Sequence, residues 1–434
     1  MDSREIEQYL IDFQKTEFPE LMPRSLSIPP SRKISAIIGP RRAGKSTYLF
    51  QMMKQNLVTG IKKENMIYLN LESTKLAGLT FKDLSDIPLL QQKLFSSSSK
   101  QFLFLDEPQN VSSWEKAVRE LHDAGHSLVV TGSSSKLLSK EIASSLRGRC
   151  LSYLLLPFSF PEFIRFQKLD VSGPVSSHEK SKILFLLKQY MEWGGFPEVW
   201  QEESDGQRLK IMESYFDLVV YRDIIERHHL KDTLLVRWFL KSLAACYAKE
   251  VSIHKLYLQL KSEGRTSSKD ELYTLAAAAN DALFLLYLPK FSWSIRKRDP
   301  VHKTYLCDVG YASLFGVGNE LGKRMENVVF LHLYRKSRPL VELAFWKNVQ
   351  QEEVDFVVRE KSKIVQLIQV CYDFKEPSTK QREIRALIKA GKELHCQDLL
   401  IITHDMEGEE IVEWFGDKAT IRYQPLWKWL LASN

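Results

Sequence analysis

The stretch GPRRAGKST, from Gly39 to Thr47, decides the fold of this chain. It has the spacing Gly-x4-Gly-Lys-Ser, and it lies between an apolar run, ISAII, and an amphipathic run, STYLFQMMKQNL. The two glycines let backbone N–H groups surround phosphate oxygens, and the N-terminus of a following helix adds partial positive charge. The pattern therefore predicts a strand, a phosphate-binding loop (P-loop) and a helix, with ATP as the ligand. We expect the nucleotide to contact Gly39, Pro40, Arg41, Arg42, Ala43, Gly44, Lys45, Ser46 and Thr47.

A second stretch, FLFLDEPQ, supplies the acidic residues that such a loop requires. Four apolar residues followed by Asp106 and Glu107 are typical of a buried parallel strand whose carboxyl end faces the ligand. We expect Asp106 and Ser46 to hold Mg²⁺, and Lys45 to reach the β- and γ-phosphates. Glu107 is expected to polarise the attacking water.

Hydroxyl and guanidinium groups further along the chain complete the predicted site. The run SLVVTGSSS predicts a strand whose end presents Thr131 and Ser133, and either hydroxyl is placed to orient water or contact the γ-phosphate. The run SLRGRC carries Arg147 and Arg149 just before the next strand. In an oligomeric ring, such an arginine supplies positive charge to the nucleotide of a neighbouring subunit. A solvated basic helix end is the alternative.

The composition is that of a folded protein with several domains. The chain has 434 residues, of which 44% are hydrophobic and 26% charged, and this length exceeds what one core usually serves. Its net charge of +7 is compatible with a polyanionic partner without demonstrating one. The five cysteines form no CxxC or Cys/His cluster, which favours a reducing cytoplasm. Because the N-terminus is charged and the apolar runs are short or interrupted, we expect a soluble protein with no membrane partner.

The order of the predicted elements indicates an α/β fold with four domains. Five short strands alternating with helices over residues 1–156 predict a parallel, doubly wound sheet, the P-loop ATPase core. Residues 157–235 are mostly helical and are expected to form a lid over the nucleotide. Residues 236–320 give the helix, turn, helix and two strands of a winged helix. Residues 321–434 form a last α/β domain.

The predicted wing of the third domain is basic. It carries Arg296, Lys297, Arg298 and Lys303, and we expect these side chains to contact DNA phosphates. The preceding helix is rich in alanine and poor in Arg, Asn and Gln, which argues against readout of bases. A winged helix that only packs against protein is the alternative.

The last domain has the layout of a PD-(D/E)xK nuclease core. A helix bears Glu326, a strand bears Asp355, and a second strand follows. Such a core uses carboxylates to bind Mg²⁺ and a lysine two residues after the last acid to activate water. Here Gln369 and Cys371 stand at those two positions, and an amide is a weak ligand for Mg²⁺. We therefore expect a degenerate nuclease that does not cut.

A resemblance to a known family covers nearly the whole chain. The motifs GPRRAGKST, LDEPQ, TGSSSKLL, LRGR, GGFPEV, YRDI, KTYLCDVG, MEN and EVDFVV, in this order, resemble those of a prokaryotic family of AAA+-type ATPases. Members of that family carry a C-terminal winged helix and a nuclease-like domain. The resemblance implies nucleotide binding and hydrolysis by Lys45, Ser46, Asp106 and Glu107, a sensor 1 role for Ser133 or Thr131, and a trans-acting arginine at Arg147 or Arg149.

Three functions are consistent with these patterns. The first is an oligomeric ATPase that acts on DNA, including branched or junction DNA, and it predicts turnover stimulated by nucleic acid. The second is a nucleotide-controlled switch that holds a protein partner, and it predicts no such stimulation. The third is an ATP-gated nuclease, which requires Mg²⁺-dependent cutting that Asp355→Ala abolishes.

Overall fold

The computed structural model describes residues 2–133, 146, 148–171, 173–293, 302–316, 320–337, 340–374, 377–414 and 416–432. Four residues with predicted roles, Arg147, Arg296, Lys297 and Arg298, lie outside these ranges. The chain divides into two compact units: Met1–Leu156 with Asp281–Leu283, and Pro157–Asn280 with Phe284–Asn434.

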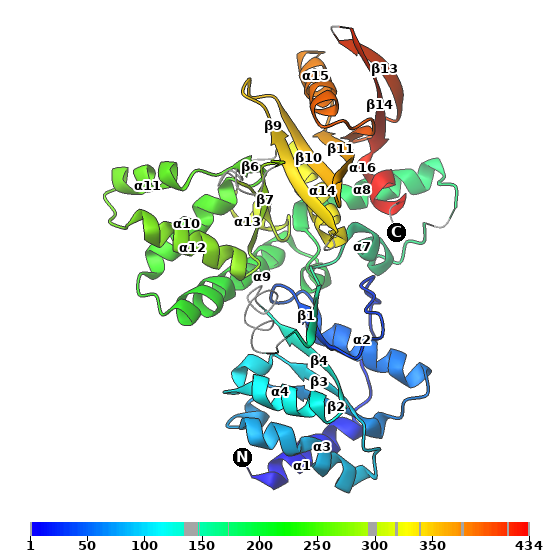
Figure 1. Ribbon diagram of the computed structural model, residues 1–434, viewed down its shortest axis with the longest axis vertical. Coiled ribbons are helices and arrows are strands. Elements are labelled where there is room, and N and C mark those ends of the chain that lie inside the picture. The colour runs from blue at the N-terminus through cyan, green and yellow to red at the C-terminus, as the bar shows by residue number, and fades with distance from the viewer. Residues whose placement is uncertain are drawn as a thin grey trace. The chain divides into compact units, whose positions relative to one another are not determined.

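The first unit is built on a sheet of five parallel strands in the order β2-β3-β4-β1-β5 (Figure 1). The strands are β1 (Ile34–Ile38), β2 (Met66–Asn70), β3 (Phe102–Asp106), β4 (Ser127–Gly132) and β5 (Cys150–Leu154). The helices are α1 (Ser3–Lys15), α2 (Lys45–Val58), α3 (Phe81–Phe95) and α4 (Trp114–Asp123), with the short turns η1 (Lys63–Asn65), η2 (Thr74–Leu76) and η3 (Pro108–Asn110). The five parallel strands predicted from the sequence are confirmed.

The strand order of this sheet gathers the predicted site residues. Every residue of the apolar strand β1 is buried, and Ile37 packs in one cluster with Phe13 of α1 and Leu49 of α2. Strand β4 lies between β3 and β1, and all three run in the same direction. Their carboxyl ends therefore meet at one edge of the sheet, where ligands of α/β proteins bind. The P-loop follows β1 at this edge.

The second unit is mostly helical in its first half. Its helices up to residue 281 are α7 (Phe160–Phe166), α8 (Ser177–Trp193), η4 (Pro197–Gln201), α9 (Asp205–Leu218), the π-helix η5 (Val219–Glu226), α10 (Thr233–Ala245), α11 (Ile253–Ser262) and α12 (Lys269–Asp281). The later ones are α13 (Tyr311–Leu314), α14 (Leu321–Lys336), α15 (Pro377–Glu393) and α16 (Leu426–Ala432). Within the described ranges, we find no helix of sufficient length and apolar character to cross a membrane.

Two sheets organise the rest of the second unit (Figure 1). A small antiparallel sheet has the order β6-β8-β7 and consists of β6 (Lys249–Glu250), β7 (Leu285–Pro289) and β8 (His302–Leu306). A mixed sheet has the order β13-β14-β12-β11-β10-β9. Its strands are β9 (Val341–Lys347), β10 (Glu353–Glu360), β11 (Lys363–Cys371), β12 (Leu399–Thr403), β13 (Gly408–Trp414) and β14 (Asp417–Pro425).

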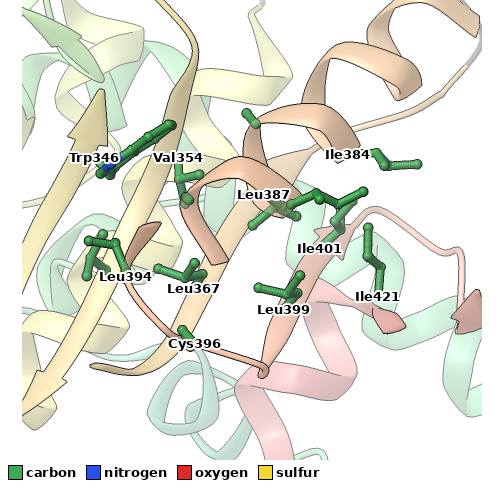
Figure 2. Packing of buried hydrophobic residues seen from close by; sticks show 14 of the residues in the cluster. Trp346, Val354, Leu367, Ile384, Leu387, Leu394, Cys396, Leu399, Ile401 and Ile421 are labelled. Atoms are coloured by element: carbon green, nitrogen blue, oxygen red, sulfur yellow. The ribbon is translucent and has the colours of Figure 1, made fainter. Parts of the chain in front are cut away.

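Helix α15 closes the core of the mixed sheet. Figure 2 shows Leu387 of α15 lying among Leu367 of β11, Leu399 of β12 and Val354 of β10, and all four side chains are buried. Val354 and Val357 of β10 both belong to this core, and the pairing of β10 with β9 shifts in register between them.

A buried carboxylate, Asp308, joins two turns of the second unit. Its Oδ2 accepts from the Gly195 N–H at 2.7 Å, and its Oδ1 accepts from the Gly310 N–H at 2.9 Å. Burial raises the pKa of Asp308 to about 6, although these two backbone hydrogen bonds oppose the rise. Asp308 therefore binds a proton more tightly in the folded protein than in the unfolded chain.

Asp308→Asn is expected to remove a pH-dependent term from the free energy of unfolding. Because the folded pKa is raised, the stabilising contribution is present at acidic pH and is lost as the pH rises through about 6. The free energy of unfolding of the wild type relative to the variant should therefore fall by about 1–1.5 kcal/mol between about pH 5 and about pH 7.5. Urea denaturation of both proteins at the two pH values measures this difference. A difference that is independent of pH would contradict the assignment.

Candidate nucleotide-binding site

The glycines of the P-loop are required by their surroundings. A Cβ on Gly39 would lie 1.9 Å from the backbone oxygen of Leu155. Gly44 has a φ of +91°, in the left-handed region that favours glycine, and it caps the N-terminus of α2. The loop can therefore turn closely from β1 into α2 and direct the free N–H groups of the first helical turn toward an anion.

Lys45 lies inside this loop. Its Nζ donates to the backbone oxygens of Gly39 at 3.0 Å and Pro40 at 3.1 Å, and it lies 3.5 Å from Glu107 Oε1. The side chain is only 6% exposed. A buried ammonium that faces two neutral carbonyls and one carboxylate can exchange the carbonyls for phosphate oxygens at little cost, because the phosphate adds charge-assisted hydrogen bonds.

Asp106, at the end of β3, is surrounded by hydroxyl groups. The Tyr68 hydroxyl donates to Oδ2 at 3.1 Å, the Thr131 hydroxyl donates to Oδ1, and the Ser46 hydroxyl is a third hydrogen-bond partner. Burial raises the pKa of Asp106, and the Ser46 and Thr131 hydroxyls partly counteract the rise. One carboxylate and one serine hydroxyl, both oxygen ligands of the kind Mg²⁺ prefers, thus lie side by side.

Glu107 follows in an unusual backbone conformation. Its φ is 54°, its N–H donates to Thr131 Oγ1 at 3.0 Å, and its Oε2 accepts from the Gln109 amide. Burial opposes ionisation of Glu107, but the Lys45 ammonium, the Gln109 amide and Arg41 outweigh it and lower the pKa of the carboxyl. Glu107 is therefore a fixed, ionised carboxylate beside the P-loop lysine.

The two candidate hydroxyls at the end of β4, those of Thr131 and Ser133, differ in what they contact. Thr131 bridges the two acids, because its hydroxyl donates to Asp106 and accepts from the backbone of Glu107. Ser133 is fully buried, and among the described residues its Oγ has no hydrogen-bond partner. The geometry thus gives Thr131 a role in orienting the acids and leaves the Ser133 hydroxyl available to a ligand.

These features fit ATP with a divalent cation. Gly39 lets the loop pack closely against the Leu155 backbone, Gly44 gives it a left-handed turn, and the Ser133 hydroxyl is an orphaned buried polar group at the same edge. Ser46 and Asp106 would hold the cation, and Lys45 would hold the phosphates. The roles of the individual residues remain predictions.

Arg149 lies beside the amino end of β1, opposite the ligand-binding edge at the carboxyl ends of the strands. Its backbone oxygen accepts from the N–H of Ile34, at the start of β1, and its guanidinium pairs with Asp123 at 3.2 Å. The P-loop follows the far end of the same five-residue strand, about 16 Å away. Arg149 therefore does not serve the P-loop of its own chain, and its trans role remains a prediction. Arg147 lies outside the described residues.

Three residues that support the site were not predicted from the sequence. The buried guanidinium of Arg24 donates to the backbone oxygens of Ala43 at 2.8 Å and Leu156 at 2.6 Å. These hydrogen bonds stabilise the P-loop by linking it to the segment that follows β5. Tyr68 and Gln109 orient Asp106 and Glu107. The position of Tyr68 two residues from the end of β2 was a usable signal, because neighbouring parallel strands end together. No comparable signal marks Arg24.

The prediction that Lys303 contacts DNA is wrong. Lys303 lies on β8 with a side chain only 3% exposed, and its Nζ is 3.0 Å from Glu326 Oε1 and 2.9 Å from Asp355 Oδ1. An ammonium enclosed by carboxylates has no free hydrogen for a phosphate. Gln369 and Cys371 are also buried, and Cys371 belongs to the apolar core beneath α15. The other predicted wing residues lie outside the described ranges.

Family models match three consecutive parts of the chain. Residues 31–164 match an AAA domain, and this range contains the P-loop, Asp106 and Glu107. Residues 184–320 and 321–419 match two different domains of unknown function.

Two curated relatives cover most of the chain. An uncharacterized protein of Methanocaldococcus jannaschii, MJ1544, is 36% identical over 401 residues, which are 92% of this chain and 88% of that protein. An uncharacterized protein of Haemophilus influenzae is 30% identical over 376 residues, 85% of this chain and 86% of its own length.

Similar solved structures include the Aeropyrum pernix ORC1 protein in complex with DNA, with 12% identity, a TM-score of 0.24, and coverage of 72% of this chain and 90% of that chain. Cdc6p from Pyrobaculum aerophilum has 11% identity, a TM-score of 0.24, and coverage of 65% and 86%. At these TM-scores the likeness supports no inference. The full-length relatives instead place this chain in the family of MJ1544, and its residues 31–164 match an AAA domain.

Proposed function

We propose that this chain binds ATP with Mg²⁺ at the P-loop and hydrolyses it, with Glu107 as the residue that polarises water. The observation that carries the proposal is the Thr131 hydroxyl, which accepts from the Glu107 N–H and donates to Asp106. One group thereby fixes both acids beside Lys45 before any ligand arrives. Such fixed groups spare the reorganisation that limits the same chemistry in water.

Each residue of the site has a separate role in hydrolysis. Lys45 leaves the Gly39 and Pro40 carbonyls to contact the β- and γ-phosphates, and this also removes its positive charge from Glu107. The Glu107 carboxylate then accepts a hydrogen bond from water in line with the γ-phosphate. Ser46 and Asp106 would hold Mg²⁺, which would neutralise phosphate charge when bound. Ser133 donates its hydroxyl to the γ-phosphate as sensor 1.

We further propose an oligomer in which Arg149, which lies far from its own P-loop, acts on the nucleotide of another subunit. The oligomeric ring, the lid formed by residues 157–235, and the choice between Arg147 and Arg149 are parts of this proposal.

We also propose a winged helix in the second unit and DNA as its partner. The elements α10, β6, α11, α12, β7 and β8 follow the order of a winged helix, with β8 in the centre of a three-stranded sheet. Exposed cations line the two helices and the turn between them: Lys255, Lys261, Arg265 and Lys269. We propose these cations, in place of Lys303, as phosphate contacts.

A protein partner is the second candidate, and the surface of α12 favours it. Beyond Lys269, the exposed side chains of this helix are Asp270, Tyr273, Thr274 and Ala277. They include no Arg, Asn or Gln, the residues that commonly read bases, and Tyr273 offers apolar surface suited to a protein interface. A nucleotide-controlled switch that holds a protein would use this face.

We further propose that α14, β9, β10, β11, α15 and β12 form a nuclease-like core without nuclease activity. An ATP-gated nuclease, the third candidate, needs an acid at position 369 and a base near position 371. Gln369 instead hydrogen-bonds to Glu383 and Asp355, and burial raises the pKa of the Cys371 thiol to about 12.

ATP turnover by the purified protein, measured alone and with single-stranded, duplex or four-way-junction DNA, tests the proposal. We expect turnover in Mg²⁺ that Lys45→Ala abolishes, together with severalfold stimulation by one form of DNA. Lys255→Ala with Lys269→Ala should weaken that stimulation and reduce the salt dependence of DNA binding by a slope of about 2.

The outcomes separate the candidates. Absence of turnover under every condition would overturn the ATPase proposal. Turnover that is unaffected by every DNA would overturn the DNA proposal and favour the protein partner. Cutting of DNA that requires Mg²⁺ and is lost in Asp355→Ala would instead identify a nuclease.

A further inference from the structure

A buried cluster of charges joins β8, α14 and β10 in the second unit. At its centre, the ammonium of Lys303 lies 2.6 Å from Glu353 Oε1, 2.9 Å from Asp355 Oδ1 and 3.0 Å from Glu326 Oε1. Lys303 and Asp355 are buried, whereas Glu353 lies at the rim with a side chain 28% exposed. One ammonium thus faces three carboxylates, one for each of its hydrogens.

Two further donors contact the carboxylates of the cluster. The Tyr305 hydroxyl donates to Glu326 Oε1 at 2.7 Å, and the Val370 N–H donates to Asp355 Oδ2 at 3.0 Å. The three carboxylates raise the pKa of Lys303 against the effect of burial, so it stays charged. Burial and the nearby Asp355 raise the pKa of Glu326 to about 7. The three carboxyl groups can therefore carry more negative charge than the Lys303 ammonium alone neutralises.

These residues do not fit the Mg²⁺ that a PD-(D/E)xK core uses. The amide of Gln369 accepts from the Asp355 N–H at 3.2 Å and donates to Glu383, so it holds two acidic residues in place. Among the described residues, no group of three or more Asp, Glu, His or Cys side chains is arranged to hold a metal ion. The position between Glu326 and Asp355, where a cation would be expected, is occupied by the Lys303 ammonium.

We propose that the Lys303 ammonium takes the place of a metal ion between Glu326 and Asp355. Its ion pairs hold β8 against α14 and β10. A second contact supports this role, because the Asn327 amide accepts from the Leu306 N–H at 2.9 Å and donates to the Leu306 carbonyl at 3.1 Å. Neighbouring residues of α14, Glu326 and Asn327, thus bind both ends of β8. The parts of the chain that match two separate domain families share this one buried core.

Replacement of Lys303 should therefore create a divalent-cation site where the wild type has none. We would titrate Mn²⁺ into the full chain and follow the free ion by electron paramagnetic resonance. Every protein would carry Ser46→Ala, so that the P-loop contributes no metal site. Lys303→Met keeps the aliphatic stem, removes the ammonium, and should bind about one Mn²⁺ at least tenfold more tightly than the parent.

Matched variants locate the new site. Lys347→Met removes a lysine that also pairs with Glu353 but lies at the rim, and it should gain no Mn²⁺ binding. Asp355→Asn added to Lys303→Met should abolish the gain. If Lys303→Met does not fold, Lys303→Met with Glu326→Gln removes one charge of each sign, and its recovery of folding would show that the lost counter-ion is the cause.

Two results would overturn the proposal. The first is Mn²⁺ binding by the parent that Asp355→Asn abolishes, because Lys303 would then not exclude the metal. This comparison needs no Lys303 variant and therefore holds whether or not Lys303→Met folds. The second is a folded Lys303→Met protein without new Mn²⁺ binding.

Discussion

Glu107→Gln is expected to lower ATP turnover by about 10²–10³-fold while ATP still binds. Glutamine has nearly the shape of glutamate and can keep the contact with Gln109, so the site should keep its geometry. It lacks the negative charge that polarises water, a charge that Lys45, Gln109 and Arg41 favour in the ligand-free protein by lowering the pKa of Glu107 against the effect of burial. The variant also frees Lys45 from its pairing with Glu107 at 3.5 Å, so its affinity for ATP should equal or exceed that of the wild type.

Single-turnover hydrolysis and binding of a fluorescent ATP analogue measure the two effects separately. Glu20→Gln is the matched control, because Glu20 is an exposed glutamate of the same unit outside the site, and it should leave turnover unchanged. A Glu107→Gln enzyme that retains more than about a tenth of the wild-type rate would assign water activation to another residue. Loss of both binding and turnover would indicate that Glu107 mainly maintains the loop.

The sequence was sufficient for the parts of the site that depend on local order. Gly39, Gly44 and Lys45 lie within one loop, and the chemistry of phosphate binding fixes their spacing. Asp106 ends an apolar strand, so its place at the ligand-binding edge follows from the parallel sheet. The strand order, with β4 between β3 and β1, then brings Thr131 to the same edge.

The sequence was insufficient where a side chain finds its partners far along the chain. Lys303 begins a strand beside a basic run, and this local context predicted an exposed cation. Its partners Glu326 and Asp355 lie 23 and 52 residues later, and only the packing of α14 and β10 against β8 reveals them. Arg24 was missed for the same reason, because its contact with the Leu156 carbonyl spans 132 residues.

A further long-range contact joins the motif GGFPEV to the motif KTYLCDVG. The first supplies Gly194 and Gly195, and the second supplies Asp308, whose oxygens accept from two backbone N–H groups. A Cβ added to Gly194 would lie 1.6 Å from Asp308 Oδ1. The two motifs therefore form one structural joint in the second unit, although 113 residues separate Gly195 from Asp308.

Gly194→Ala is expected to destabilise the second unit by about 4 kcal/mol or more, for two independent reasons. Gly194 has φ 75° and ψ −157°, a conformation that residues with a Cβ rarely adopt. The new methyl group would also displace the Asp308 carboxylate and leave the Gly195 N–H buried without its acceptor, a loss of about 1–3 kcal/mol by itself.

Gly206→Ala is the matched control for this variant. Gly206 lies near the start of α9, and a Cβ there would meet no atom within 4 Å. Since alanine favours the helix, this change should be neutral or stabilising by up to about 1 kcal/mol. Urea denaturation of both variants, followed by tryptophan fluorescence, measures the difference. Gly194→Ala with wild-type stability would mean that the turn relaxes around the methyl group, and the joint between Gly194 and Asp308 would then not be needed for folding.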